Sequence, residues 1–319
     1  MATHLILGGC GFIGRHVAAR LLQQGEHVTL ADRQPLSEIP PDLLAKNLEF
    51  ESLDLASADW TSLIANCDIV HHYAWSSLPQ SANEDPAADL TTNVGSMLKL
   101  LEAMRGRGGK RLVFASSGGT VYGKLKSIPV REDHPLNPIT AYGVSKVAAE
   151  KYMGLYRGLY GLDCRVARIS NPFGAGQDPA RQQGAVTTFV LRALAGQKIT
   201  IWGNGEVVRD YIHISDVTRA LATLASANLD DYGELPVFNI GSGQGTSLNE
   251  LVSAIASHSE RELEVEYTEF RPFDIPVNIL DVTLAEQVLG WHCALTFDEG
   301  IELAINDMRQ GESLFSTLK

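Results

Sequence analysis

The chain has few cysteines and a shortage of basic residues. Cys10, Cys67, Cys164 and Cys293 are scattered, with no CxxC pair and no histidine at metal-ligand spacing beside them. This pattern excludes a disulfide framework and argues against a zinc site, so we expect reduced thiols and no metal. Lysine and arginine number 26 against 38 aspartates and glutamates, and the formal charge of −12 disfavours nucleic acid and anionic membranes as partners.

Long apolar runs, low-complexity tracts and internal repeats are also missing. No stretch reaches the ~20 apolar residues that a membrane span requires, and no basic region precedes the first apolar run, Leu5-Ile6-Leu7. We therefore expect a cytoplasmic protein. What the chain does have is 319 residues with 45% hydrophobic content, enough to bury one large core or two closely joined ones.

Short apolar runs alternate with helical patterns over the first two-thirds of the chain. The runs lie at residues 4–7, 27–31, 69–74, 111–115, 163–169 and 237–240, and helical patterns lie at 14–24 and 95–104. Such alternation predicts parallel strands joined by right-handed helical crossovers, in a doubly wound α/β sheet. Helical patterns from residue 248 and at 298–308, with a strand at 263–268, predict a smaller C-terminal α/β lobe.

A glycine-rich turn follows the first predicted strand. Gly8, Gly11 and Gly14 have the GxxGxxG spacing, and the turn opens a helix that includes Phe12 and Ile13. The glycines allow a tight turn and close approach of a pyrophosphate, to which the helix N-terminus offers unpaired N–H groups. We therefore predict a dinucleotide site in a Rossmann-type fold.

Acidic residues at the ends of the next two strands complete the predicted nucleotide site. Asp32 ends the second strand, where its carboxylate can accept from both ribose hydroxyls and would repel a 2′-phosphate. Asp32 therefore favours NAD over NADP as the cofactor. Because Arg33 follows it, NADP stays open as an alternative. Asp54 and Leu55, after the third strand, are candidates for holding the adenine.

Tyr142 and Lys146 are the most informative pair of side chains further along the chain. If the segment is helical, their spacing of four places them on one face. A free tyrosine ionises near pH ~10, so a nearby ammonium that favours the phenolate could make it a base near neutrality. Two surface residues of an amphipathic helix would have the same spacing, and only their context separates the two interpretations.

Several motifs supply that context through their order. After the glycine turn come SSGGTVYG at 116–123 and the Tyr142–Lys146 pair, then NPFG at 171–174, WGNG at 202–205, RDYIH at 209–213, NIGSG at 239–243 and RPFD at 271–274. In these motifs the chain resembles the extended short-chain dehydrogenase/reductase family, specifically its nucleotide-sugar epimerases and dehydratases, over nearly its whole length. The resemblance implies an NAD-binding Rossmann domain of residues 1–170, to which 210–245 returns, and a substrate-binding lobe of 171–209 and 246–319.

The resemblance also implies chemical roles. Tyr142 is expected to take a proton from a sugar hydroxyl, while Lys146 holds the nicotinamide ribose and lowers the tyrosine pKa. A third hydroxyl should relay the proton, but the usual position is Gly118 here. Ser117 is the best substitute, followed by Ser116 and Thr120.

Further contacts follow from the same resemblance. The implied cofactor contacts are Tyr73, Ala74, Trp75, Asn93 and Ser116, and the implied substrate contacts are Ser117, Gly118, Asn171, Trp202, Arg209, Arg271, Asp274 and Asn278. The two arginines are expected to hold the diphosphate. Trp202 could pack near the nucleobase or in the core, and Asn278 permits a larger sugar such as an N-acetylhexosamine.

These expectations lead to a UDP-hexose 4-epimerase with NAD, working by transient oxidation at C4, as the leading hypothesis. An NAD(P)H-dependent 4-reductase of a 4-keto-6-deoxy sugar nucleotide is the nearest alternative, and a non-catalytic dinucleotide sensor is another. A 4,6-dehydratase is disfavoured, because such relatives carry Asp-Glu where this chain has Gly118-Gly119. The resemblance further implies a homodimer and a role in polysaccharide precursor synthesis.

Overall fold

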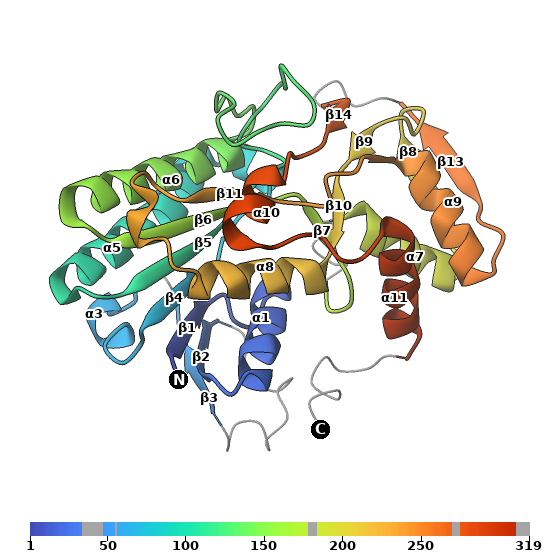
Figure 1. Ribbon diagram of the computed structural model, residues 1–319. Helices are drawn as coiled ribbons and strands as arrows, with labels where there is room; N and C mark the ends of the chain where they lie inside the picture. Colours follow the sequence, from blue (N-terminus) through green and yellow to red (C-terminus); the bar gives the residue numbers. More distant parts are fainter. Residues whose placement is uncertain (34–46, 55, 178–183, 270–274, 311–319) are drawn as a thin grey trace.

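A seven-stranded parallel sheet organises the larger lobe of the computed structural model, which describes residues 1–33, 47–54, 56–177, 184–269 and 275–310 (Figure 1). The order across the sheet is β3-β2-β1-β4-β5-β6-β11. The strands are β1 (Thr3–Leu7), β2 (His27–Asp32), β3 (Leu48–Ser52), β4 (Ile69–His72), β5 (Arg111–Ser117), β6 (Asp163–Ile169) and β11 (Val237–Ile240). The strand order reverses between β1 and β4, and ligands of such sheets bind outside the carboxyl ends of the strands at this point. The predicted doubly wound Rossmann-type fold is confirmed.

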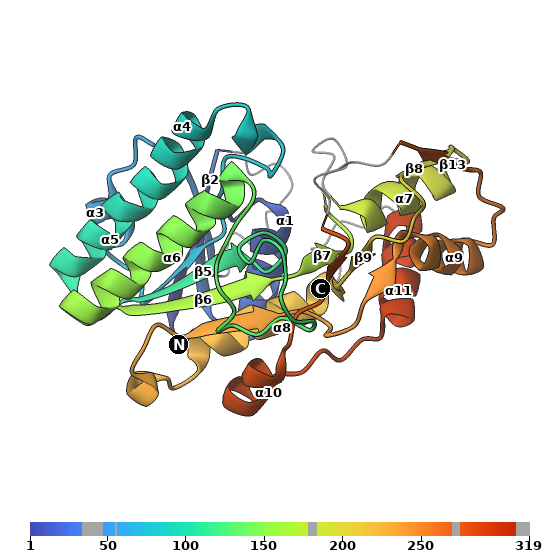
Figure 2. The same ribbon diagram turned by 90° about the horizontal axis from the view of Figure 1, so that it is seen from above.

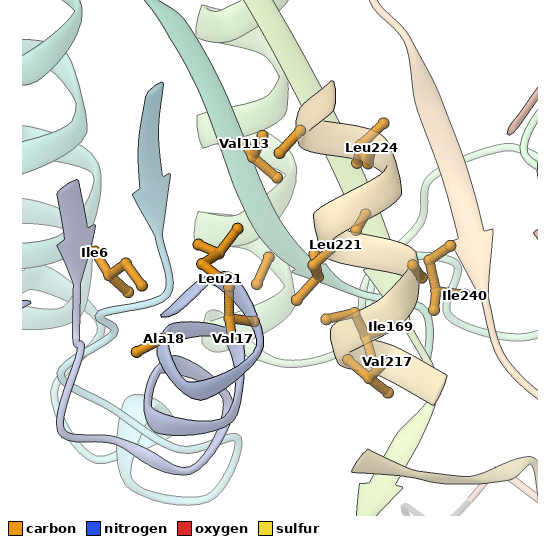
Figure 3. Close-up of a cluster of buried hydrophobic side chains, with 14 of the residues drawn as sticks. Ile6, Val17, Ala18, Leu21, Val113, Ile169, Val217, Leu221, Leu224 and Ile240 are labelled. Atoms are coloured by element: carbon orange, nitrogen blue, oxygen red, sulfur yellow. The ribbon is translucent and has the colours of Figure 1, made fainter. Parts of the chain in front are cut away.

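Helices cover both faces of this sheet, as Figure 2 shows from above. One face carries α1 (Phe12–Gln23) and α8 (Ile214–Ser226), and the other carries α3 (Trp60–Leu63), α5 (Gly95–Arg107) and α6 (Ala141–Tyr160). Apolar side chains of α1 and α8 meet those of the sheet in the first core cluster (Figure 3). Alternate residues of β5 point to the two faces, so that Val113 joins this cluster while Phe114 packs under α6.

Three short helical segments connect β4 to α5. These are η2 (Ser81–Asn83), α4 (Pro86–Asp89) and a π-helical turn, η3 (Leu90–Val94). The π turn runs directly into α5, so the chain from residue 86 to 107 is nearly continuous helix. None of the helices in the described ranges is both long and apolar enough to span a bilayer.

The smaller lobe has its own core. Its elements are β7 (Asn171–Phe173), α7 (Ala185–Leu194), β8 (Ile199–Trp202), β9 (Val208–Arg209), β10 (Tyr211–His213), β12 (Thr246–Ser247), α9 (Leu248–Ser259), β13 (Val265–Thr268), β14 (Val277–Asn278) and α11 (Phe297–Gln310). Apolar faces of α7, α9 and α11 pack together here, beside β8 and β10. One segment differs from the predicted boundary: α10 (Thr283–Leu289) and the chain after it place Ala285 and Trp291 in the core of the larger lobe.

Candidate active site

The glycine loop, residues 8–14, connects β1 to α1. Within it, the backbone at the start of α1 lies very close to the backbone at the start of the loop. Gly8 has φ +79°, which disfavours any residue with a Cβ. A Cβ at Gly14 would lie 2.2 Å from the Gly8 carbonyl oxygen. The first turn of α1 therefore packs directly on the loop, and a pyrophosphate could approach the backbone without meeting a side chain there.

The start of α1 and the end of β2 form one nucleotide-binding surface. Gly11 is the N-cap of α1, and no side chain caps this end, so its first N–H groups, including those of Phe12 and Ile13, have no helical partner. Asp32 accepts a hydrogen bond from Cys10 N (3.0 Å), which holds its carboxylate beside the glycine loop. The residues present therefore fit a dinucleotide whose ribose lies next to Asp32.

The residues predicted near the adenine lie at the same edge. Arg33 is exposed and its N–H donates to Asp32 Oδ1 (2.7 Å). Leu53 N donates to the Asp32 carbonyl (2.9 Å), which brings the exposed Asp54 after β3 close to Asp32. Leu55 lies outside the described residues, so its predicted contact is left as a prediction.

The end of β4 completes the cofactor edge at the strand-order reversal. The N–H groups of Tyr73 and Ala74 both donate to the Leu7 carbonyl (2.9 Å each), and Ala74 N is the atom that a Cβ on Gly8 would meet, at 2.6 Å. The Tyr73 hydroxyl lies 2.7 Å from His71 Nδ1, so its ring is directed into the sheet. Trp75 instead turns toward α6.

Helix α6 begins just before the predicted base. Thr140 is the N-cap and its hydroxyl accepts from Gly143 N (3.1 Å), while the Asn83 side chain accepts from Ala141 N (2.8 Å). These two caps fix the first turn, on which Tyr142 lies. The predicted helical spacing is therefore correct, and Lys146 follows one turn later on the same face.

Lys146 is the centre of what we call the lysine pocket, which is formed by Trp75, Asp89, Phe114, Tyr142 and Lys146. The lysine is only 3% exposed. Its Nζ donates to the Ala115 carbonyl (2.8 Å) and lies 3.7 Å from the Trp75 ring centroid, 4.6 Å from that of Phe114 and 5.5 Å from that of Tyr142. Lys146 is thus buried, Tyr142 is half-buried, and the two side chains are within reach of each other, so the interpretation as two surface residues is wrong.

Burial moves the pKa values of this pair in opposite directions. It lowers the pKa of Lys146 to about 7, with Glu150 and Asp89 acting against the shift. It raises the pKa of Tyr142 well above 10, and the Asp89 carboxylate adds to that rise. The expectation that Lys146 lowers the tyrosine pKa is therefore not met by the protein groups alone, because desolvation is the larger effect.

Asn93 and Ser116 are bound to protein groups. Asn93 Oδ1 accepts from Ser76 N (2.9 Å) and its Nδ2 donates to Asp89 (2.8 Å), so it orders the loop after Trp75. The Ser116 hydroxyl donates a hydrogen bond to the buried carboxylate of Glu150, a residue of α6. This direction removes Ser116 from the candidates for proton relay, and a cofactor contact through either side chain stays a prediction.

The structure explains the glycine at position 118. A Cβ there would lie 2.5 Å from Leu280 Cδ1, and Leu280 is fully buried. A serine at the usual position would therefore clash with the chain that follows β14. Ser117 is half-buried and makes no hydrogen bond through its hydroxyl within the described residues, while Thr120 Oγ1 is buried there without a partner, so both are open as relays.

The predicted substrate contacts come together beside the end of β5. Asn278 on β14 pairs with Arg209 on β9, and Asn278 Nδ2 donates to the Gly118 carbonyl (3.4 Å). Asn171 lies at the start of β7 and donates to the Asp210 carbonyl (2.9 Å). Trp202 is 44% exposed, so packing in the core is wrong for it. Arg271 and Asp274 lie outside the described residues.

Three polar residues of the site were missed by the sequence reading. Asp89 accepts a hydrogen bond from Ser145, the neighbour of Lys146, and Glu150 of α6 forms a buried ion pair with Arg168 of β6 (2.7 Å). Glu150 does follow Tyr142 and Lys146 at successive intervals of four, and this helical spacing could have indicated it. Asp89 and Arg168 are distant in sequence and had no such indication. The described residues hold no cluster of side chains able to ligate a metal.

Comparison with known proteins agrees with this geometry. The model of the NAD dependent epimerase/dehydratase family matches residues 4–241. The chain is 36% identical to UDP-glucose 4-epimerase of Mycolicibacterium smegmatis, over 96% of this chain and 98% of that protein. The structure of UDP-glucose 4-epimerase from Thermotoga maritima with UDP-glucose matches with a TM-score of 0.89 and 33% identity, covering 97% and 99% of the two chains. That of the Thermus thermophilus enzyme with NAD matches with a TM-score of 0.87 and 31% identity, covering 97% and 100%. The chain therefore belongs to the NAD-dependent epimerase/dehydratase family.

Proposed function

We propose that the protein is an NAD-dependent UDP-hexose 4-epimerase. The observation that supports the proposal is the pair formed on α6 by Tyr142 and the buried Lys146, whose Nζ lies 5.5 Å from the centroid of the Tyr142 ring. Bound NAD supplies a hydride acceptor and donor for C4, so the net redox change is zero. The named relatives with this activity, among them those solved with UDP-glucose and with NAD, support the substrate and cofactor.

The side chains of this chain would divide the work as follows. Tyr142 acts as a phenolate, which a protonated Lys146 favours, and it becomes a neutral phenol when it takes the proton from the C4 hydroxyl. The same proton returns to the C4 oxygen when hydride is given back to C4. Ser117 or Thr120 passes the proton between sugar and phenol. Arg209 on β9 stands where the diphosphate of the substrate is expected.

One experiment separates epimerase from 4-reductase. Purified protein is incubated with UDP-glucose or UDP-N-acetylglucosamine without added cofactor, and the products are separated by chromatography. Formation of the C4 epimer without net NAD(P)H consumption supports the proposal. Stoichiometric NAD(P)H consumption with a 4-keto sugar nucleotide, without epimerisation, would establish the reductase instead, and binding of NAD without any turnover would indicate a sensor.

The same screen addresses the sugar. Asn278 is buried and its Oδ1 has no hydrogen-bond partner in the described residues. An amide with a free acceptor at this place suits a sugar substituent with an N–H donor. We therefore expect UDP-N-acetylglucosamine to be accepted as well as UDP-glucose, and Asn278→Ala to reduce turnover of the N-acetylated sugar more than that of UDP-glucose.

A homodimer is part of the proposal, with a second copy of this chain seated on α6. The outer face of α6 exposes large apolar side chains: Val144 (50%), Tyr152 (39%), Leu155 (48%), Leu159 (62%) and Tyr160 (46%). Figure 2 shows α6 beside α5 on the outside of the sheet, where a pair of helices could meet its symmetry mate as a four-helix bundle. Polysaccharide precursor synthesis is a proposal that rests on the resemblance alone, and location in the cytoplasm is one that rests on the sequence pattern.

Light scattering tests the dimer. Leu155→Glu combined with Leu159→Glu should give a monomer, because two charges cannot be buried at an apolar interface. Glu286→Lys is the control and should leave the mass unchanged, because this exposed residue lies on α10, which packs with α1 and α8 on the other face of the sheet. A wild-type protein that elutes with the mass of one chain would contradict this part of the proposal.

A further inference from the structure

Asp89 is a buried carboxylate with no cationic partner. It ends α4 and is 4% exposed. Its two oxygens accept hydrogen bonds from Ser77, from Asn93 Nδ2 (2.8 Å) and from Ser145. All three donors are neutral, and no ion pair to Asp89 is formed within the described ranges. A buried charge of this kind is costly unless a cation lies near it.

Lys146 is a buried lysine that forms no ion pair within the described residues, and the Asp89 carboxylate acts to raise its pKa. It lies one residue after Ser145, which Asp89 holds, and its Nζ makes its hydrogen bond to the Ala115 carbonyl. Glu150, on the next turn, is already bound by Arg168 through both oxygens and by the Ser116 hydroxyl. Asp89 and Lys146 are thus two buried ionisable groups without an ion-pair partner in the described residues, and the hydrogen bond from Ser145 links Asp89 to the turn of α6 that carries Lys146.

The segment that carries Asp89 also has an unusual backbone. A π-helical turn, Leu90–Val94, follows it directly, and such turns are frequent at functional sites. Asp89 and Asn93 both point inward from this segment, to each other and to the 76–77 loop that continues from Trp75. The hydrogen bonds of Asp89 thus join three segments around the lysine pocket: the 76–77 loop, the π turn and the first turns of α6.

We infer that Asp89 is a positioning residue of the proposed epimerase, which supplies the counter-charge that keeps Lys146 an ammonium and ties the Tyr142–Lys146 turn of α6 to the 76–77 loop. The inference rests on the proposed function for its catalytic consequence. The Asp89 carboxylate acts on this turn of α6 in two ways: it accepts the hydrogen bond from Ser145, and its negative charge acts on Lys146.

The sign of the effect is the same for both members of the pair. A negative charge next to a lysine disfavours loss of the ammonium, and next to a tyrosine it disfavours formation of the phenolate, so it raises both pKa values. The other ionisable groups that face this region are Glu150 on α6, Arg168 on β6 and His72 on β4. Burial lowers the pKa of His72 to about 3. None of them is changed by a substitution at position 89.

The test is Asp89→Asn, which removes the charge and retains the shape. If the inference is correct, both limbs of the pH profile of kcat move toward acid by on the order of one pH unit. The Nζ chemical shift of Lys146, followed in protein with isotope-labelled lysine and assigned with Lys146→Met, should titrate at correspondingly lower pH without any substrate. Asp85→Asn is the matched control, because this exposed N-cap of α4 tolerates asparagine and should leave both titrations in place.

The outcomes decide separate questions. A fall in kcat without movement along the pH axis, or an unchanged Lys146 titration, would overturn the inference and leave Asp89 a structural residue. If Asp89→Asn does not fold, Asp89→Ala removes the charge without adding a donor and is subject to the same two readouts. Absence of epimerisation by the wild type would instead overturn the proposed function, while the lysine titration would still test the role of Asp89.

Discussion

The glycine loop and the lysine pocket lie at the same edge of the sheet but are built in different ways. The glycine loop consists of backbone, closely packed because residues 8, 11 and 14 have no side chain. The lysine pocket consists of side chains from the loop after β4 and from β5, α4 and α6, and its central charges, Asp89 and Lys146, are buried. The glycine loop leaves space in which a ligand could approach the backbone. The lysine pocket shifts the pKa values of Tyr142 and Lys146 by excluding water from them. Substitutions should therefore fail differently in the two regions.

The largest effect is expected in the glycine loop. Gly14→Ala places a Cβ 2.2 Å from a backbone oxygen, which cannot move without displacing α1 from β1. We expect loss of NAD binding by more than about 100-fold, or failure to fold. Calorimetric titration measures the NAD affinity, and circular dichroism shows whether the variant folds. Gly95→Ala, where a Cβ meets nothing within 4 Å, is the control and should retain binding; equal affinity of the Gly14→Ala variant would contradict the close packing.

Tyr142→Phe is the corresponding change in the lysine pocket. It removes the acid–base group and keeps the ring beside Trp75, so kcat should fall by about 10²–10⁴-fold while NAD affinity stays the same. Chromatographic epimerisation assays and NAD titration measure these quantities. Tyr152→Phe, on the exposed face of the same helix, should leave kcat unchanged. Retained activity in Tyr142→Phe would refute the assigned base.

Gly118→Ser tests how the two lobes meet at the end of β5. The added Cβ meets Leu280 at 2.5 Å, so the free energy of unfolding should fall by about 1–3 kcal/mol in denaturant titrations. Gly119→Ser is a neighbouring control, since its Cβ meets only Ser117 Oγ at 4.0 Å. Leu280→Ala combined with Gly118→Ser should recover part of the loss, and strict additivity of the two changes would contradict the clash.

The smallest effect concerns pH. Both ring nitrogens of His72 are buried and have no hydrogen-bond partner among the residues that the structure describes, and burial lowers its pKa from 6.5 to about 3. The unfolded chain takes up the proton first, so stability is full above pH 6.5 and is lost as the pH falls toward about 3. For one histidine this is about 2 kcal/mol between pH 6.5 and pH 5. His72→Phe should flatten the decline of Tm in that window, and parallel curves for variant and wild type would contradict the assignment.

The same contrast governs how much of the molecule could be predicted. The strand and helix patterns, the glycine loop and Asp32 were predictable, because each depends on residues near one another in sequence or on a known order of strands. Trp202 could not be assigned between core and surface, since its apolar ring suits both, and the structure leaves it 44% exposed. The spacing of Tyr142 and Lys146 could not indicate that burial raises the pKa of Tyr142, because a spacing indicates neighbours but not the removal of water around them.

The sequence by itself determined the doubly wound sheet, the dinucleotide site and the Tyr142–Lys146 pair, because hydrophobic period, glycine spacing and helical spacing act within a few residues or repeat regularly. Only the tertiary structure decided that Leu280 occupies the space of a serine side chain at position 118 and that Asp89 faces the lysine pocket. Ser145 and Asp89 are 56 positions apart, and Asn278 and Gly118 are 160 apart. Contacts over such separations depend on how the two lobes and the helices pack, and no local pattern encodes them.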